Sequence, residues 1–114
     1  MLSHRYRFHS RGGVRYVYQK GKTIRTPNFS LIYTPNTRGK LRVAVVASKK
    51  VLKTAVGRNR IRRRVYEAIR LELPAYRKPV DYIFVIYSQS VRTMPFSELR
   101  RHIRELLDRS LINP

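Results

Sequence analysis

The spacing of hydrophobic positions along the chain changes between a helical period and a strand period, and this change predicts the elements. Val14, Val17 and Tyr18 have helical i, i+3, i+4 spacing, which predicts a first helix that ends before Gly21. Residues 1–11 precede it as an extended basic arm. The same kind of spacing predicts an amphipathic C-terminal helix with a longer set of apolar positions: Phe96, Leu99, Ile103, Leu106 and Leu107.

Three apolar segments are too short for helices and lie among prolines, glycines and asparagines, which is typical of strands. They cover residues 29–33, 41–48 and 81–87. The third is strongly apolar, which indicates a central, buried strand. Because side chains alternate between the faces of a strand, the first segment divides into two sets, which are Phe29, Leu31 and Tyr33 on one face and Ser30 and Ile32 on the other.

A basic helix is predicted after Thr54, which is a candidate N-cap. At 100° per residue, four apolar side chains fall on one arc about 100° wide, the width of a core-facing stripe. These are Ile61, Val65, Ala68 and Ile69. The opposite side carries Arg60, Arg63, Arg64 and Arg70, and the stripe is flanked by Arg62 and Tyr66.

The predicted order of helices and strands is that of an α+β domain in which helices pack on a small sheet. The length of 114 residues suits one domain, so we expect residues 1–114 to form a single domain. A hydrophobic fraction of 42% is too high for a disordered tail. The sequence contains no internal repeat and no low-complexity segment.

The positive charge is concentrated in the first part of the chain. The net charge is +20, and all six acidic residues follow residue 66. Residues 1–66 hold 18 Lys and Arg, and residues 67–114 hold 8, so the two parts carry +18 and +2 (8 − 6). Repulsion among so many positive charges destabilises the isolated fold, and this favours a polyanionic partner. A surface that serves only solubility normally mixes both signs, and an anionic membrane is less favoured because neither terminus predicts a strongly amphipathic basic helix with bulky aromatic anchors.

Several classes of protein are disfavoured by what the sequence lacks. Without cysteine there is no disulfide framework, thiolate zinc site or cysteine nucleophile. The longest apolar runs are too short to cross a bilayer, and the first residues lack the apolar core of a secretory signal, so we expect a cytoplasmic protein. The histidines are scattered and each carboxylate is alone within its element. No catalytic residue, metal site or protein-bound cofactor is therefore predicted.

The segment from Arg58 to Arg70 is the strongest chemical signal. It holds six arginines and a single acid, Glu67, which we interpret as an intrahelical partner of Arg63 and Arg70. Arginine presents a planar set of donors that binds phosphate with two hydrogen bonds and stacks on bases. The amide of Asn59 suits a base edge or a 2′-hydroxyl. The pattern therefore predicts contact with structured nucleic acid.

Aromatic residues lie among the basic ones in the acid-free part of the chain, although core packing is the more common role for each ring taken alone. One face of the strand at residues 29–33 has to face the core. The other face, covered by the first helix, is a candidate groove for an unpaired strand that stacks on rings.

Several segments of this sequence resemble the signature of the bacterial ribonuclease P protein component. The resemblance rests on residues 47–51, on Ala55-Val56 and above all on Arg58-Asn59-Arg60-Ile61-Arg62-Arg63. It extends in order from Arg7-Phe8 to the helix that begins near Phe96, which is nearly the whole chain.

The resemblance implies a sheet of about four strands in the order α-β-β-(β)-α-β-α, with an unusual left-handed crossover. It implies a protein subunit that binds ribonuclease P RNA and precursor tRNA, while the RNA subunit removes the 5′ leader with Mg²⁺; no protein partner is predicted. Carried over by position, the RNA-subunit surface comprises Arg7, Lys49, Lys50, Lys53, Arg58, Asn59, Arg60, Arg62 and Arg63. The leader groove comprises Val14, Tyr18, Ser30 and Ile32.

The chain departs from the family's pattern at three places. Arg64-Val65-Tyr66 stands where the family tends to have two leucine-like residues and a basic one, Val14 stands where a Phe is frequent, and Gly57 is expected to weaken the first helical turn. Three alternatives remain at this point. They are a structural RNA-binding protein such as a ribosomal protein, a nuclease active without RNA, and a DNA-binding protein.

Overall fold

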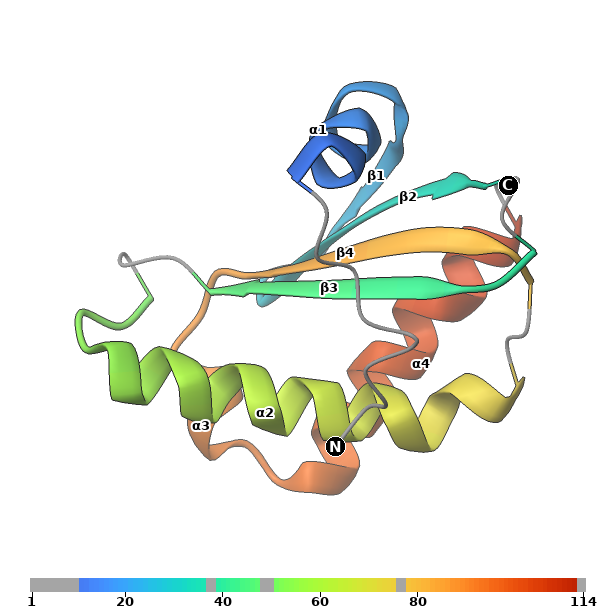
Figure 1. Cartoon of the computed structure of the whole chain (residues 1–114). Coiled ribbons are helices and arrows are strands. Elements are labelled where there is room, and N and C mark those ends of the chain that lie inside the picture. Colours follow the sequence, from blue (N-terminus) through green and yellow to red (C-terminus); the bar gives the residue numbers. More distant parts are fainter. Residues whose placement is uncertain (1–10, 37–38, 48–50, 76–77, 113–114) are drawn as a thin grey trace.

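The computed structural model describes residues 11–36, 39–47, 51–75 and 78–112 (Figure 1). The elements in chain order are α1 (Arg11–Lys20), β1 (Lys22–Arg25), β2 (Phe29–Pro35), β3 (Arg42–Ala47), α2 (Ala55–Glu72), the 3₁₀ turn η2 (Leu73–Ala75), β4 (Val80–Ile86), α3 (Ser90–Thr93) and α4 (Phe96–Ile112).

One four-stranded sheet with the order β1-β2-β4-β3 separates two layers of helices. β1 pairs with β2 and β2 with β4 in antiparallel fashion, whereas β3 and β4 are parallel. α2 joins these two parallel strands in a left-handed crossover, a rare hand for this connection (Figure 1). α1 lies on one face of the sheet, and α2 and α4 lie on the other.

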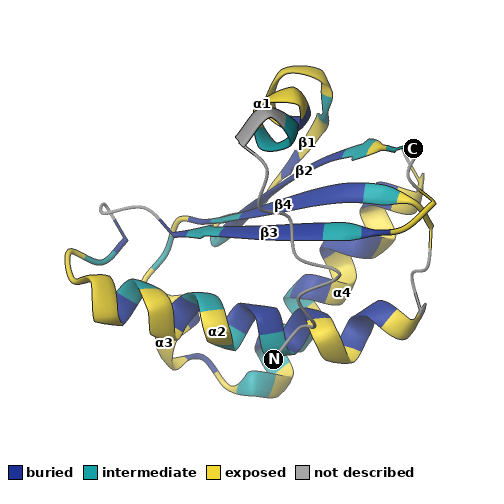
Figure 2. Ribbon diagram, in the orientation of Figure 1, coloured by how far each residue is buried: buried dark blue, intermediate teal, exposed yellow. Residues whose placement is uncertain are grey.

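The two faces of the sheet bury different amounts of apolar surface. The alternation predicted for β2 is confirmed, because Phe29, Leu31 and Tyr33 belong to the main core under α2 and α4. Ile32 points the other way, into a small cluster with Val17 of α1. Buried residues therefore follow the strands and the inner sides of α2 and α4 (Figure 2).

α2 begins as the sequence predicts, and its glycine is explained by the cap. Thr54 has an extended backbone, and its hydroxyl accepts a 3.1 Å hydrogen bond from the Gly57 amide. A Cβ at Gly57 would lie 2.8 Å from Thr54 Oγ1 and 3.0 Å from Leu52 Cδ1. Glycine lowers the helix propensity at position 57, but it permits the close approach of Thr54 and Leu52, which a side chain would prevent.

Two of the six acidic residues are buried, Glu72 and Asp81, and both are paired with arginines of neighbouring elements. Glu72 at the end of α2 accepts 2.8 Å hydrogen bonds from Nε of Arg100 and of Arg104 on α4. Burial alone would raise the pKa of Glu72, but the two guanidinium groups outweigh it and hold this pKa below its usual value. Asp81 on β4 is held by Arg42 on β3 with hydrogen bonds of 2.8 and 2.7 Å. Both acids join neighbouring elements.

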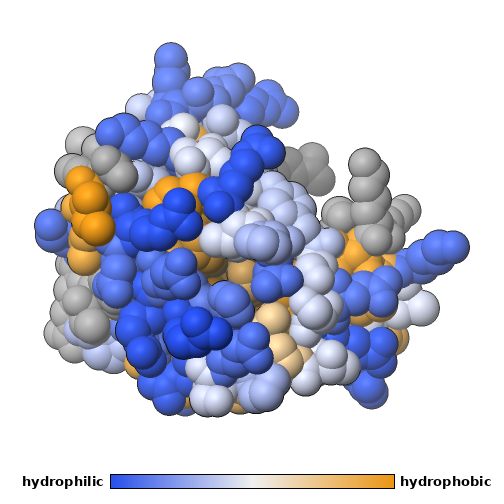
Figure 3. Space-filling view, turned by 180° about the vertical axis from the view of Figure 1, so that it is seen from behind, coloured by the Kyte–Doolittle hydropathy of each residue, from blue (hydrophilic) through white to orange (hydrophobic). Residues whose placement is uncertain are grey.

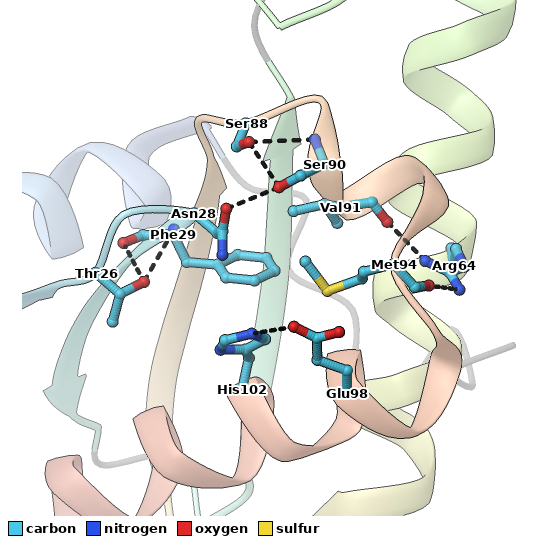
Figure 4. A network of polar contacts seen from close by, with 10 residues as sticks. All are labelled: Thr26, Asn28, Phe29, Arg64, Ser88, Ser90, Val91, Met94, Glu98 and His102. Atoms are coloured by element: carbon cyan, nitrogen blue, oxygen red, sulfur yellow. Dashed lines mark hydrogen bonds and ion pairs between the residues drawn. The ribbon is translucent and has the colours of Figure 1, made fainter.

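Two short elements, β1 and α3, were not predicted from the sequence pattern. β1 has a single apolar side chain, Ile24, so it lacks the alternation that marks a strand. α3 spans only four residues and is held by its surroundings. Its first residue, Ser90, donates a 2.9 Å hydrogen bond to Asn28 Oδ1 in the turn before β2 (Figure 4).

Candidate nucleic-acid interface

The outward side of α2 presents arginines from its first three turns. Ile61, Val65, Ala68 and Ile69 are buried as predicted, so the helix has a fixed orientation on the core. Arg60 and Arg63 are exposed on the side away from the sheet, and so is Asn59. We call the set Arg58, Asn59, Arg60, Arg62 and Arg63 the α2 ridge.

Two members of the α2 ridge also hold the local structure. Arg58 is half-buried and its Nη1 donates 3.0 Å hydrogen bonds to the carbonyls of Leu52 and Lys53. It therefore fixes the connector that leads into the helix. Arg62 donates to the side-chain oxygen of Asn59, one turn earlier on the same face. These contacts reduce the freedom of two side chains before any ligand binds.

Arg64 does not lie on this outward side, which corrects the sequence interpretation. Its guanidinium group donates a 2.7 Å hydrogen bond to the Val91 carbonyl and a second one to the Met94 carbonyl (Figure 4). It also lies 5.8 Å from the centre of the Phe96 ring. Arg64 therefore holds the segment from α3 to α4 against α2.

Tyr66 is a core residue rather than a flanking one. It is buried, and its hydroxyl accepts a 3.2 Å hydrogen bond from the Val45 amide on β3. Arg64 and Tyr66, two of the residues that depart from the family's pattern, thus both serve packing.

Glu67 pairs with Arg70 on the exposed side of α2, which confirms one of its two predicted partners. The hydrogen bonds from Arg70 lower the pKa of Glu67 to about 2. The carboxylate stays charged at neutral pH and offsets the positive charge of Arg70, which lies beyond the α2 ridge. Lys53 is exposed in the connector before α2, whereas Arg7, Lys49 and Lys50 lie outside the described residues.

The residues predicted for leader contact lie on the face of the sheet toward α1 or on α1 itself. In the register of the strands, Arg25, Ser30, Val85 and Val46 form one row across all four strands on the face toward α1. Val85 and Val46 are only partly buried, whereas the next row, which includes Ile32, is covered by Val17. We call the surface formed by this row and the adjacent side of α1 the α1 groove.

The four residues predicted for leader contact differ in their exposure to solvent. Tyr18 is 46% exposed and Val14 is half-buried, so both present surface from α1. Ile32 is buried beneath the helix. Ser30 is also buried, and its hydroxyl forms a hydrogen bond with the hydroxyl of Tyr87.

Tyr87 was missed because the whole segment 81–87 was interpreted as buried. It follows β4 directly and is 47% exposed. Its position has the same parity as Val85, so the alternation along the strand places it on the α1 side. That alternation is the signal by which the sequence could have identified it.

Comparison with known proteins shows to which family this chain belongs. Residues 2–111 match the sequence model of the family described as Ribonuclease P. The chain belongs to the ribonuclease P protein family. It is 40% identical over 100 residues to the ribonuclease P protein component of Chloroflexus aurantiacus, covering 88% of this chain and 73% of that protein. The protein component of Symbiobacterium thermophilum is 38% identical over 106 residues, which cover 92% and 90% of the two chains.

Solved structures of ribonuclease P proteins have the same fold. The Thermotoga maritima protein aligns with a TM-score of 0.80 over 90% of this chain and 96% of its own. The Staphylococcus aureus protein aligns with a TM-score of 0.78 over 92% and 94%. Both are 22% identical to this chain, so these two likenesses establish the fold alone.

Membership of the ribonuclease P protein family makes the chain a subunit of the ribonuclease P holoenzyme, an endoribonuclease of tRNA processing that contains ribonuclease P RNA. The relatives give no support to the ribosomal alternative. Within the described residues, no group of three or more His, Asp or Glu is arranged to hold a metal ion. The helices of the same part of the chain include none that is long and apolar enough to cross a membrane.

Proposed function

We propose that the chain binds ribonuclease P RNA through the α2 ridge and the 5′ leader of precursor tRNA in the α1 groove, while the RNA subunit cleaves the leader with Mg²⁺. The observation that carries this proposal is the separation of the two surfaces by the sheet. α2, which carries the α2 ridge, lies against one face of the sheet, and α1 lies on the other face (Figure 1).

The α2 ridge suits a folded RNA with closely spaced phosphates. Its arginines project from one rigid helix, because four apolar side chains on the other side of α2 are buried. Exposed guanidinium groups such as those of Arg60 and Arg63 can each contact phosphate with two hydrogen bonds. Lys53 is exposed in the connector and extends the positive surface beyond the helix.

The α1 groove suits a single strand. Its floor holds partly exposed Val85 and Val46, and its walls hold the rings of Tyr18 and Tyr87. Bases of an unpaired strand stack on such rings without strong sequence preference, which is what a variable leader requires. A duplex keeps its bases stacked on each other and offers no such contact.

The protein is proposed to contribute binding and orientation rather than bond cleavage. The two buried carboxylates, Glu72 and Asp81, are each held by arginine. The histidine on α4, His102, lies 3.6 Å from Glu98 and beside the ring of Phe29 (Figure 4). Neither arrangement points to a nucleophile. In this proposal the RNA subunit holds the Mg²⁺ ions of the reaction.

Reconstitution with a bacterial ribonuclease P RNA tests this function. The protein should raise the rate of precursor tRNA cleavage at low Mg²⁺, at which RNA alone is slow. Protein without RNA should cleave nothing. The proposal fails if the protein gives no gain over RNA alone at any Mg²⁺ concentration, or if protein alone cleaves and EDTA stops it.

A further inference from the structure

We propose that Arg92 on α3 is a further contact for ribonuclease P RNA and widens the RNA-binding surface from α2 onto a second element. This inference rests on the proposed function, in which the α2 ridge binds the RNA subunit, and it names a residue to which the sequence analysis gave no role. It is carried by the attachment of α3 to α2, by the exposure of Arg92 and by the distribution of acidic residues along the chain.

α3 is attached to α2 by the side chain of Arg64. Its guanidinium group donates one hydrogen bond to the Val91 carbonyl and one to the Met94 carbonyl, so the two bonds enclose Arg92 along the chain (Figure 4). An isolated helix of four residues is not stable in water, and α3 therefore depends on such contacts with its surroundings. The backbone of Arg92 is fixed relative to α2, although its own side chain faces solvent.

Two further contacts hold the same segment, so the position of Arg92 does not depend on Arg64 alone. Val91 is 0% exposed and packs in the main core. Ser90 donates a 2.9 Å hydrogen bond to Asn28 Oδ1 in the turn before β2. Arg92 is thus presented by a short helix that is held on more than one side.

The attachment places α3 beside the turn of α2 that carries Arg60. Arg60 precedes Arg64 by four residues, and side chains at i and i+4 are neighbours on a helix surface, with Cβ atoms about 5–6 Å apart. Helical side chains also lean toward the N-terminus, so the guanidinium group of Arg64 lies over the turn of Arg60. α3 packs against α2 and is bonded to this group (Figure 1). Arg92 and Arg60 therefore lie on adjoining parts of the surface.

The two segments that meet there contain no acidic residue. The sequence has no Asp or Glu before residue 67 and none from residue 82 to residue 97. Arg92 and Arg60 are both exposed, so no carboxylate of their own segments competes with an external anion for the two guanidinium groups. Such a pair on two fixed elements suits the closely spaced phosphates of a folded RNA, because each guanidinium group can bind phosphate with two hydrogen bonds.

The affinity of the protein for ribonuclease P RNA tests the contribution of Arg92. Arg92→Ala should weaken binding about tenfold and lower the log–log salt slope by roughly 0.7–0.9, the value of one phosphate contact. Arg92→Lys keeps the charge and loses the planar set of donors, so it should keep the slope and lose less affinity. The matched control is Arg101→Ala, which removes the same charge from an exposed position on α4 and should bind as the wild type. Midpoints of urea unfolding should be equal for all three variants and the wild type.

The lack of cysteine in the chain permits a second, independent measurement. A single cysteine can carry an iron–EDTA probe, which produces hydroxyl radicals and cuts the RNA backbone close to the labelled residue. In the reconstituted holoenzyme, probes on Arg92→Cys and on Arg60→Cys should cut ribonuclease P RNA at overlapping or adjacent nucleotides. A probe on Arg101→Cys should not cut these nucleotides.

The outcomes separate this inference from the function on which it rests. If the Arg60→Cys probe cuts no ribonuclease P RNA, and Arg60→Ala combined with Arg63→Ala binds the RNA as the wild type does, the α2 ridge itself is wrong. If the α2 ridge passes both tests but Arg92→Ala keeps full affinity and an unchanged salt slope, Arg92 makes no RNA contact and the inference is wrong. Cuts from position 92 in precursor tRNA in place of the RNA subunit would also overturn it, because the contact would then be with the substrate.

Discussion

The two faces of this small sheet carry surfaces of different construction. The α2 ridge consists of long charged side chains on one rigid helix, and the α1 groove consists of rings and small apolar side chains from several elements. Charge acts over about 8–10 Å at physiological salt, so the ridge tolerates small displacements of its partner. Stacking requires contact, so the groove depends on the position of each ring. The difference suits a permanent RNA partner on one side and a changing single strand on the other.

The arginines of α2 are themselves divided between binding and packing. Arg60 and Arg63 face solvent, whereas Arg64 is bonded to the carbonyls of Val91 and Met94. An arginine on α2 is therefore not necessarily an RNA contact. Substitutions along α2 should separate the two roles.

The largest effect is expected for Arg60→Ala combined with Arg63→Ala. Affinity for ribonuclease P RNA should fall roughly a hundredfold, at about 1.5 kcal/mol for each lost arginine–phosphate contact. The log–log salt slope should decrease by roughly 1.4–1.8 for two phosphate contacts. Filter binding over a range of salt concentrations measures both quantities.

The control for this double variant is Arg101→Ala combined with Arg109→Ala, which removes the same charge from the exposed side of α4. Figure 3 shows that the face opposite to that in Figure 1 is also covered mainly by hydrophilic side chains. If the α4 variant loses as much RNA affinity as the α2 variant, binding follows net charge and the α2 ridge has no special role.

A smaller effect, and on a different property, is expected for Arg64→Ala. Loss of two hydrogen bonds from a charged donor and of the contact with Phe96 should lower the free energy of unfolding by about 1–3 kcal/mol. The salt slope for RNA binding should stay unchanged. Urea denaturation and filter binding measure the two properties, and a lower slope without loss of stability would place Arg64 on the RNA.

The periodicity of the sequence was sufficient for α2 but not for Arg64. The buried stripe at Ile61, Val65 and Ile69 follows from the helical repeat alone, because any helix on a core buries one arc. Angular position does not reveal which other segment passes over the helix. The chain between α3 and α4, distant in sequence, covers Arg64 and converts a predicted surface residue into a structural one.

The α1 groove was predicted in part for a similar reason. Alternation along β2 correctly placed Ser30 and Ile32 on the face toward α1. It did not show that Val17 covers Ile32, since this depends on where the helix docks. β1 was not located because Ile24 is its single apolar residue, and with it Arg25 was overlooked.

The smallest effect is expected on the stability of the protein in acid, and it depends on Glu72. Its pKa is lowered in the folded protein, so its stabilisation is present above the usual pKa near 4.5 and is lost as the pH falls through the lower folded value. Stability should therefore decrease progressively below about pH 4.5. Glu72→Gln should flatten this decrease in urea titrations at several pH values, and an unchanged acid slope would contradict the role of its pairing with Arg100 and Arg104.

Glu67 provides the contrast on the exposed side of α2. Its pKa is lowered to about 2 by Arg70, but the pair is open to solvent and screened by salt. The contribution of Glu67 to acid stability should disappear in 1 M salt, whereas that of buried Glu72 should persist.

The most direct test compares the two surfaces in one experiment. Holoenzymes are reconstituted with the Arg60→Ala/Arg63→Ala variant or with Tyr18→Ala. Two quantities are measured for each, the affinity for ribonuclease P RNA and the ratio of precursor to leaderless tRNA affinity at saturating protein. The α2 variant should lose RNA affinity and keep the ratio, and Tyr18→Ala should keep RNA affinity and lose the ratio. If either variant changes both quantities equally, the α2 ridge and the α1 groove are not separate binding surfaces.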